Sequence, residues 1–144
     1  MKDLNLDEVY FYLLERAVRQ FRKYSQQLFD EQGITLSGEQ WVVLKRISEN
    51  EGINQREIAE LTYKDPASVT RMLDLLEKQD LVSRQPVENN RRTYALFLTI
   101  EGKKLVKKIT PIAVAARKKG LENIREKDAE KLKQVLNQIY DNLS

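Results

Sequence analysis

The sequence predicts a mainly α-helical fold with a small β-wing. A short helix, a tight turn and a second helix are expected between residues 54 and 78, and two strand-like segments joined by a basic tip follow them. Both ends of the chain have the pattern of long amphipathic helices, with more apolar surface than one small neighbour would cover. These observations indicate a winged helix-turn-helix core, residues 37–99, flanked by an N-terminal dimerisation helix (residues 1–36) and C-terminal dimerisation helices (residues 100–144).

Composition narrows the classes of function. The chain has 144 residues, 41% hydrophobic and 33% charged, which is enough for one buried core. It has no Cys and no His, so disulfides, thiolate nucleophiles, the usual zinc sites and a histidine general base are excluded. No run approaches the roughly 18 to 20 apolar residues of a membrane span, and the first residues lack the pattern of a signal peptide. We expect a cytoplasmic protein with no cofactor, no membrane partner and no enzymatic activity.

The charge of the chain is unevenly distributed. The formal net charge is +3, but residues 37–99 hold 9 Lys and Arg against 10 Asp and Glu, whereas residues 100–119 hold 7 against 1. The helix-turn-helix region as a whole is therefore not basic. Nucleic-acid binding by this region has to depend on where its cations lie.

The first helix is expected over residues 7–31. Its apolar positions keep helical spacing over about five turns, and they are Tyr10, Leu13, Leu14, Ala17, Phe21, Tyr24 and Leu28. A long apolar helix at a terminus can be shared between two subunits or can pack on its own domain, and this segment alone leaves both open. Gly33 is expected to end the helix in a left-handed conformation.

The second helix is expected to begin after Ser37. Ser37 and Gln40 have the spacing of a capping box, and the helix should continue to about Asn50. Its buried face is expected to carry Trp41, Leu44 and Ile47. Trp41 could instead line a ligand pocket, although a lone Trp on an apolar stripe is more often part of a core.

The third helix, Gln55 to Leu61, is expected to be short, with a second capping box formed by Asn54 and Glu57. Gln55 and Arg56 lie at its N-terminus, where free backbone amides and the helix dipole favour a phosphate. Arg56 could equally pair with a carboxylate of its own helix. Residues 62–64 then leave a three-residue turn, the length typical of a helix-turn-helix.

The fourth helix is expected to begin at Pro66, with Asp65 as its N-cap. Its buried stripe is expected to be Val69, Met72, Leu73 and Leu76. The residues left facing outward near its start are Ala67, Ser68, Thr70 and Arg71. This set is small, hydroxyl-bearing and cationic, so it is suited to a DNA major groove. Lys64, the last residue of the turn, is included in the predicted DNA-binding surface.

Residues 81–85 and 94–98 are expected to form the two strands of the wing, separated by residues 86–93. Asn90, Arg91 and Arg92 lie near the tip. An arginine in this place can enter a minor groove, where a narrow A·T tract concentrates negative potential. The alternative is an ordinary polar hairpin end. Beside a helix-turn-helix we favour contact with DNA.

A fifth helix is expected after Thr99 and a last one from about Glu126. Pro111 should kink the fifth helix. That helix carries the run Lys103, Lys104, Lys107 and Lys108, which is either a solvated face or a source of non-specific attraction to phosphate. The apolar positions of the last helix are Ala129, Leu132, Val135, Leu136, Ile139 and Leu143.

The economical way to bury both ends of the chain is in a two-fold symmetric homodimer. Such a dimer would direct two reading helices and two wings to one side of double-stranded DNA. Half-sites about 10 base pairs apart, on a near-palindromic operator, follow from that geometry.

Four segments together resemble the MarR family of bacterial winged helix-turn-helix regulators: residues 36–44, 67–77, 81–84 and 90–102. The resemblance implies a dimer held by the first, fifth and sixth helices, a recognition helix carrying Ser68, Thr70 and Arg71, and a wing arginine at Arg92. Family members are typically repressors that release DNA when a small, often phenolic or anionic ligand binds between the dimer and the DNA-binding regions.

The sequence departs from the family pattern at two positions. Asn90 stands where the family usually has an Asp that orients the wing arginine. Asp80 stands where the family usually has Gly, so this Asp is expected to adopt a left-handed turn conformation. The absence of cysteine excludes the branch of the family that senses oxidants through a cysteine.

We expect a dimeric, sequence-specific DNA-binding transcriptional regulator, a repressor released by a small aromatic or anionic effector. The alternative is a winged-helix protein-interaction module that does not read DNA, which the near-neutral charge of residues 37–99 leaves open. The candidate effector residues are Tyr10, Arg16, Tyr24 and Trp41. For each of them, a plain core or surface role is the competing interpretation.

Overall fold

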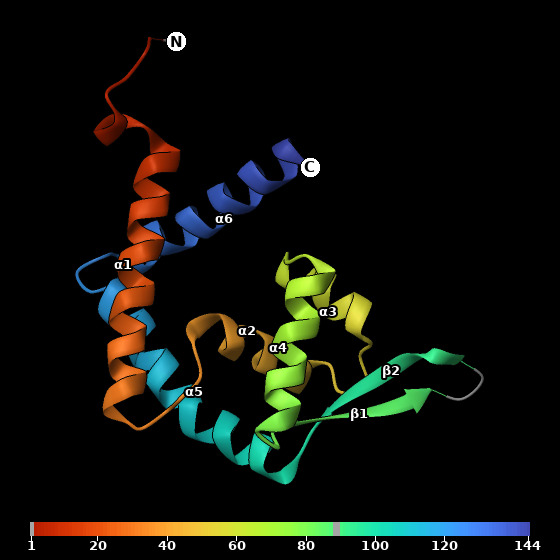
Figure 1. Ribbon diagram of the computed structural model, residues 1–144. Coiled ribbons are helices and arrows are strands. Elements are labelled where there is room, and N and C mark those ends of the chain that lie inside the picture. The colour runs from red at the N-terminus through yellow and green to blue at the C-terminus, as the bar shows by residue number, and fades with distance from the viewer. Residues whose placement is uncertain (1, 88–89) are drawn as a thin grey trace.

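The computed structural model describes residues 2–87 and 90–144, except the side chains of residues 90–92. Its elements are η1 (Leu6–Glu8), α1 (Tyr10–Glu31), α2 (Gly38–Glu49), α3 (Gln55–Thr62), α4 (Pro66–Lys78), β1 (Val82–Val87), β2 (Asn90–Leu98), α5 (Ile100–Gly120) and α6 (Glu126–Leu143) (Figure 1). The predicted mainly α fold with a two-stranded wing is confirmed. In the described ranges, none of the helices is both long enough and apolar enough to span a membrane.

Both predicted capping boxes are present, and they fix where α2 and α3 begin. The Ser37 hydroxyl accepts a hydrogen bond from the Gln40 backbone N–H (3.1 Å), and the Gln40 side chain accepts one from the Ser37 N–H (2.9 Å). Asn54 and Glu57 make the same reciprocal pair at 2.8 and 3.5 Å. Tyr63 ends α3 in the left-handed conformation (φ 56°). The short turn between the two helices is therefore set by local chemistry.

The core lies between the helices of the winged domain, the base of the wing and α5. Its fully buried large side chains include Leu36, Leu44, Ile47, Ile58, Leu73, Leu76, Leu96 and Ile109. The predicted stripe of α4 is confirmed, with Val69 also buried and Met72 partly so. On α2, Leu44 and Ile47 are buried as expected, as is Val43, which the sequence places alongside them, whereas Trp41 is only partly buried. A free edge of Trp41 is therefore available to a neighbouring hollow.

The two strands of the wing pair antiparallel, with Val82 opposite Leu98. They extend further than residues 81–85 and 94–98, because pairing continues toward the tip beyond Pro86, where the register shifts. A proline is tolerated there because an edge strand does not need its missing N–H for the ladder.

The second strand is also held on its other edge. The Leu96 N–H donates to the Ile53 carbonyl (2.8 Å), and the Gly52 N–H donates to the Leu96 carbonyl (2.9 Å). Gly52 and Ile53 come just before α3. The wing is thereby tied to the start of the helix-turn-helix.

Helix α5 begins against the turn between α4 and β1. The Thr99 hydroxyl caps α5 by accepting from the Gly102 N–H (2.9 Å), and it donates to the Asp80 carbonyl (2.6 Å). The Thr99 N–H donates to the Leu81 carbonyl (3.1 Å). Asp80 has the left-handed conformation (φ 59°) that the sequence predicts. The base of the wing, the end of α4 and the start of α5 thus meet at one point.

The two terminal helices leave large apolar side chains exposed. On α1 they are Tyr10, Phe11, Tyr12, Val18 and Phe21, and on α6 they are Leu132, Val135, Leu136, Tyr140 and Leu143. Every residue of α6 is exposed or only partly buried. Figure 1 shows α1 on the side of the molecule away from the wing. Helix α5 joins the two parts and continues as one helix through Pro111, where a kink was expected.

Gly102→Ala should lower the free energy of unfolding by about 1–3 kcal/mol. A Cβ at this position would lie 2.1 Å from the Leu81 carbonyl oxygen, so the backbone of α5 or of the turn has to move. Gly38→Ala is the matched control, because a Cβ added there meets nothing within 4 Å. Urea denaturation of both variants measures the difference. Equal midpoints for the two variants would contradict this packing constraint.

Candidate nucleic-acid interface

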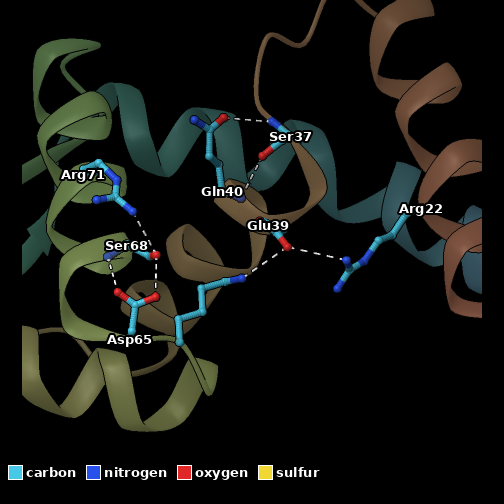
Figure 2. A network of polar contacts seen from close by, with 8 residues as sticks. Arg22, Ser37, Glu39, Gln40, Asp65, Ser68 and Arg71 are labelled. Carbon is cyan, nitrogen blue, oxygen red and sulfur yellow. Dashed lines mark hydrogen bonds and ion pairs between the residues drawn. The ribbon is translucent and has the colours of Figure 1, made fainter. Parts of the chain in front are cut away.

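The start of α4 carries a connected set of polar side chains (Figure 2). One Asp65 carboxylate oxygen accepts from the Ser68 N–H (2.9 Å) and the other accepts from the Ser68 hydroxyl (2.6 Å). The Ser68 oxygen in turn accepts from Arg71 Nη2 (3.2 Å). The Ser68 side-chain bond is the largest cause that lowers the pKa of Asp65. Arg71 is therefore held over the first turns of the predicted reading helix.

Two predicted DNA-binding residues also bond to each other. Gln55 Nε2 donates to Thr70 Oγ1 (2.5 Å), and the Thr70 hydroxyl donates to the Pro66 carbonyl one turn earlier (2.9 Å). This pair joins the first turn of α3 to the first turns of α4. Sequence analysis missed this role, because the two residues lie fifteen positions apart and share no local pattern.

The outward surface of α4 has graded exposure. Ala67 and Arg71 are exposed, whereas Ser68 and Thr70 are partly buried.

At the start of α3, the Arg56 side chain is 89% exposed and lies 3.4 Å from Glu60. The structure thus shows the pairing within the helix that the sequence left open. A pair this exposed is weak, so a phosphate can replace it.

The wing is joined to α4 by Arg84, which sequence analysis missed. Arg84 Nη2 lies 2.7 Å from Asp74 Oδ1, and Arg84 Nε lies 4.0 Å from Glu77 Oε2. The Arg84 side chain is 19% exposed. The backbone of Asn90, Arg91 and Arg92 belongs to β2, and their side chains are outside the described part of the chain.

A cleft of about 750 Å³ lies between α3, the start of α4 and the wing. Gln55, Arg56, Lys64, Pro66 and Arg84 are among the residues that line it. Three of these five side chains are cationic. Glu60, the ion-pair partner of Arg56, also lines the cleft, so three cations face one carboxylate between the two elements expected to contact DNA.

Lys64, predicted to bind DNA, makes an ion pair inside the protein. Its Nζ lies 3.3 Å from Glu39 Oε1, and its side chain is 19% exposed. The same Glu39 oxygen lies 3.5 Å from Arg22 Nη1 of α1 (Figure 2). Arg22, Glu39 and Lys64 thus connect α1 to the residue before the N-cap of α4.

A separate cavity of about 330 Å³ lies between α1, α2 and α5. Its lining residues include Phe21, Phe29 and Trp41, together with the polar Arg22, Ser25, Glu39, Lys64 and Arg117. This volume is at the lower end of the range for small-molecule sites. Among the described residues, no cluster of side chains could hold a metal ion.

One of the four candidate effector residues lines this cavity. Trp41 does, whereas Tyr10, Arg16 and Tyr24 are not among the lining residues. The cavity side of α1 is formed by positions 18, 21, 22, 25 and 29. Arg16 and Tyr24 lie on other faces of the helix, and Tyr10 lies about two turns earlier. Phe21 of the expected stripe does line the cavity, and its members Leu13, Leu14, Tyr24 and Leu28 are partly buried.

Known proteins match both the sequence and the fold. The model of the MarR family matches residues 36–94. The HTH-type transcriptional regulator SarZ of Staphylococcus aureus (strain USA300) is 30% identical over 104 residues, which are 72% of this chain and 67% of SarZ. The family match covers the helix-turn-helix, the first strand of the wing and the beginning of the second.

Two solved structures show the same fold. The S. aureus MepR–DNA complex aligns with a TM-score of 0.87 at 22% identity, covering 94% of this chain and 99% of MepR. BpsR of Bordetella bronchiseptica, whose DNA binding is regulated by 6-hydroxynicotinic acid, aligns with a TM-score of 0.88 at 21% identity, covering 97% of this chain and 99% of BpsR.

Asp65→Ala should lower the urea midpoint of unfolding near neutral pH, because α4 loses its N-cap. The pKa of Asp65 is lowered in the folded state, so its stabilising contribution is complete above the ordinary pKa of an Asp carboxyl. The contribution is lost as the pH falls through the lower folded-state pKa. The two proteins should therefore converge in strongly acidic urea titrations. A difference in urea midpoint between the two proteins that stays constant with pH would contradict this role. Asp65→Asn is the control, because Asn can cap the helix without a charge.

Proposed function

Because the chain belongs to the MarR family, we propose that it works as a homodimer that reads a near-palindromic site on double-stranded DNA. As a member of this family it is a DNA-binding transcriptional regulator. The observation that carries the proposal is the polar network at the start of α4, which holds Arg71 over the exposed first turns of that helix. Catalysis forms no part of the proposal, and its relatives are named as transcriptional regulators.

The exposed apolar faces of the terminal helices support pairing with a second copy of the chain. Apolar side chains that are 40% exposed or more occur along both α1 and α6, and Leu143 reaches 77%. Exposed apolar area on this scale usually marks an interface. Pairing of α1, α5 and α6 with their counterparts in a second chain would cover these faces. We therefore assign residues 1–36 and 100–144 to dimerisation and residues 37–99 to DNA binding.

The winged domain supplies the contacts with DNA. The start of α4 enters the major groove with Ala67, Ser68, Thr70 and Arg71. Gln55 and Arg56 meet a phosphate at the start of α3, where the dipole favours an anion. At the wing, Asn90, Arg91 and Arg92 contact the backbone and the minor groove; the resemblance supports Arg92, and the position of the other two near the predicted tip supports them. Lys103 and Lys104 lie at the start of α5, just after the end of β2 that is farthest from the tip of the wing, so we assign them no base contact.

We assign the cavity between α1, α2 and α5 to a small aromatic or anionic effector that releases the protein from its operator. It lies between the proposed dimerisation helices and the winged domain, and it combines aromatic walls with cationic side chains. An effector bound there would contact Lys64, which directly precedes the N-cap of α4. A repressor acting on chromosomal DNA works in the cytoplasm, the location that the sequence predicts.

Fluorescence anisotropy with a duplex from the promoter next to its own gene tests DNA binding. Affinity should fall steeply as salt rises, because phosphate contacts release counterions. Arg71→Ala should cost about 1–3 kcal/mol of binding free energy and relax the preference over a random duplex. Arg92→Ala should weaken binding to both duplexes.

Lys78→Ala is the matched control, since it removes one cation from the other end of α4. It should leave the affinity within about threefold of the wild type, a loss below 1 kcal/mol. Absence of binding at low salt, or unchanged affinity in both arginine variants, would refute this mode of binding. Either result would favour the alternative function, a winged-helix protein-interaction module that does not read DNA.

Sedimentation equilibrium at micromolar concentration should find a dimer. Leu132→Glu combined with Leu136→Glu should shift the population to monomers, because two carboxylates would be buried in the interface without partners. Gln134→Glu places one carboxylate on the exposed surface of the same helix and should leave the dimer intact. A wild-type monomer would rule out the proposed assembly.

A further inference from the structure

Lys64 lies between the two hollows of the molecule. Its side chain lines the cleft that faces the proposed DNA surface, and it also lines the cavity between α1, α2 and α5. It directly precedes Asp65, the N-cap of α4. When a group in the cavity holds the Lys64 ammonium, that charge is not available in the cleft. The occupant of the cavity therefore affects the positive charge of the cleft.

Glu39 holds Lys64 on the cavity side in this structure. A single oxygen, Oε1, lies 3.3 Å from Lys64 Nζ and 3.5 Å from Arg22 Nη1. The Glu39 side chain is 45% exposed and Arg22 is 62% exposed. The Arg22 pair therefore contributes little free energy, and the Lys64 pair, in which Lys64 is 19% exposed, is screened by solvent on the Glu39 side. The carboxylate of Glu39 can therefore be replaced by another anion without a large loss.

The polar groups of the cavity favour an anion. Among the described residues that line it there are three cations, Arg22, Lys64 and Arg117, and one carboxylate, that of Glu39. The Ser25 hydroxyl, also in the lining, is buried and has no hydrogen-bond partner in the described part of the chain. A buried polar group without a partner is costly. A ligand oxygen would satisfy the hydroxyl, and its charge would meet an excess of cations.

We propose that an anion in the cavity and a DNA phosphate in the cleft compete for Lys64, with Glu39 as the internal anion that both must displace. This inference rests on the proposed function, because it names the regulation of the proposed effector site. An effector carboxylate takes over the Lys64 ammonium, which lowers the positive charge available to DNA. By linkage, bound DNA lowers the affinity for the anion by the same factor.

Benzoate is a suitable probe, and benzamide is its neutral match in shape. Trp41 is the single tryptophan of the chain and lines the cavity, so its fluorescence reports occupancy. Benzoate should change the fluorescence and raise the dissociation constant for DNA. Benzamide at the same concentration should do neither.

Substitutions at the two partners should act in opposite directions. Glu39→Gln removes the internal competitor and should tighten benzoate binding about fivefold, the scale of a partly exposed ion pair. Lys64→Gln should weaken benzoate binding. Saturating benzoate should then leave the DNA affinity of the Lys64→Gln variant unchanged, because the shared cation is gone.

Glu49→Gln is the matched control. Glu49 is on the same helix, is 47% exposed and pairs with Arg46 at 4.0 Å, outside the cavity. It should match the wild type in both measurements. Thermal unfolding of each variant confirms that it is folded, and Lys64→Gln decides the question by itself if Glu39→Gln does not fold.

Three outcomes would overturn the inference. If benzamide is as effective as benzoate, charge plays no role. If benzoate does not alter Trp41 fluorescence, it does not bind in this cavity. Benzoate that weakens DNA binding equally in the wild type and in Lys64→Gln would remove the shared cation. A protein that binds no DNA even without benzoate fails as the proposed regulator. The fluorescence titrations of the Glu39 and Lys64 variants still test the competition in that case.

Discussion

The close approach of α5 to the Leu81 carbonyl is the constraint on which the other parts depend. Only a residue without a Cβ fits at Gly102. Beside it, the Thr99 hydroxyl donates to the Asp80 carbonyl and the Thr99 N–H donates to the Leu81 carbonyl. The end of α4, the first strand of the wing and the long helix leading to α6 are thus fixed at one point. Because the core adds Leu76 and Leu96 around it, this end of the recognition helix has little freedom to move.

The other end of the recognition helix is held in a different way. Val69 is buried in the core beneath the first turns of the helix, and the polar connections of this end are the Gln55–Thr70 hydrogen bond, the Asp65 cap and the ion pairs of Glu39, all at least partly open to solvent. Exposed ion pairs are weak and sensitive to salt, whereas the packed end is held by buried apolar contacts. Both ends of the helix are therefore anchored by buried side chains, and the polar contacts on the outer side of its N-terminus are the ones that can exchange partners when a ligand binds. The residues proposed to read DNA lie at that end.

Local chemistry made most of the fold predictable, and tertiary contacts account for what was missed. The caps at Ser37, Asn54, Asp65 and Thr99 all depend on residues within three positions, so their patterns could be recognised directly. The Gln55–Thr70 and Arg84–Asp74 contacts join separate elements, and nothing in the spacing of these residues indicates them. Helical spacing gives the faces of a helix but not which face meets a cavity, so the effector roles of Tyr10, Arg16 and Tyr24, which do not line the cavity between α1, α2 and α5, stay predictions.

The near-neutral charge of residues 37–99 does not oppose DNA binding, because of where the carboxylates lie. Asp65 and Glu57 are occupied as helix caps, Asp74 and Glu77 lie beside Arg84, and Glu39 lies against Lys64 on the cavity side. Asp74, Glu77 and Glu39 are thus close to cations of the fold, whereas Asp65 and Glu57 accept hydrogen bonds as caps and keep their charge. Over a Debye length of about 8 Å at physiological salt, a phosphate responds to the nearest groups rather than to the total. At the start of α4 these nearest groups are the exposed Arg71 and the Asp65 carboxylate joined to it through Ser68, and a cation exchanged between Glu39 and the cleft changes the local potential without any change in net charge.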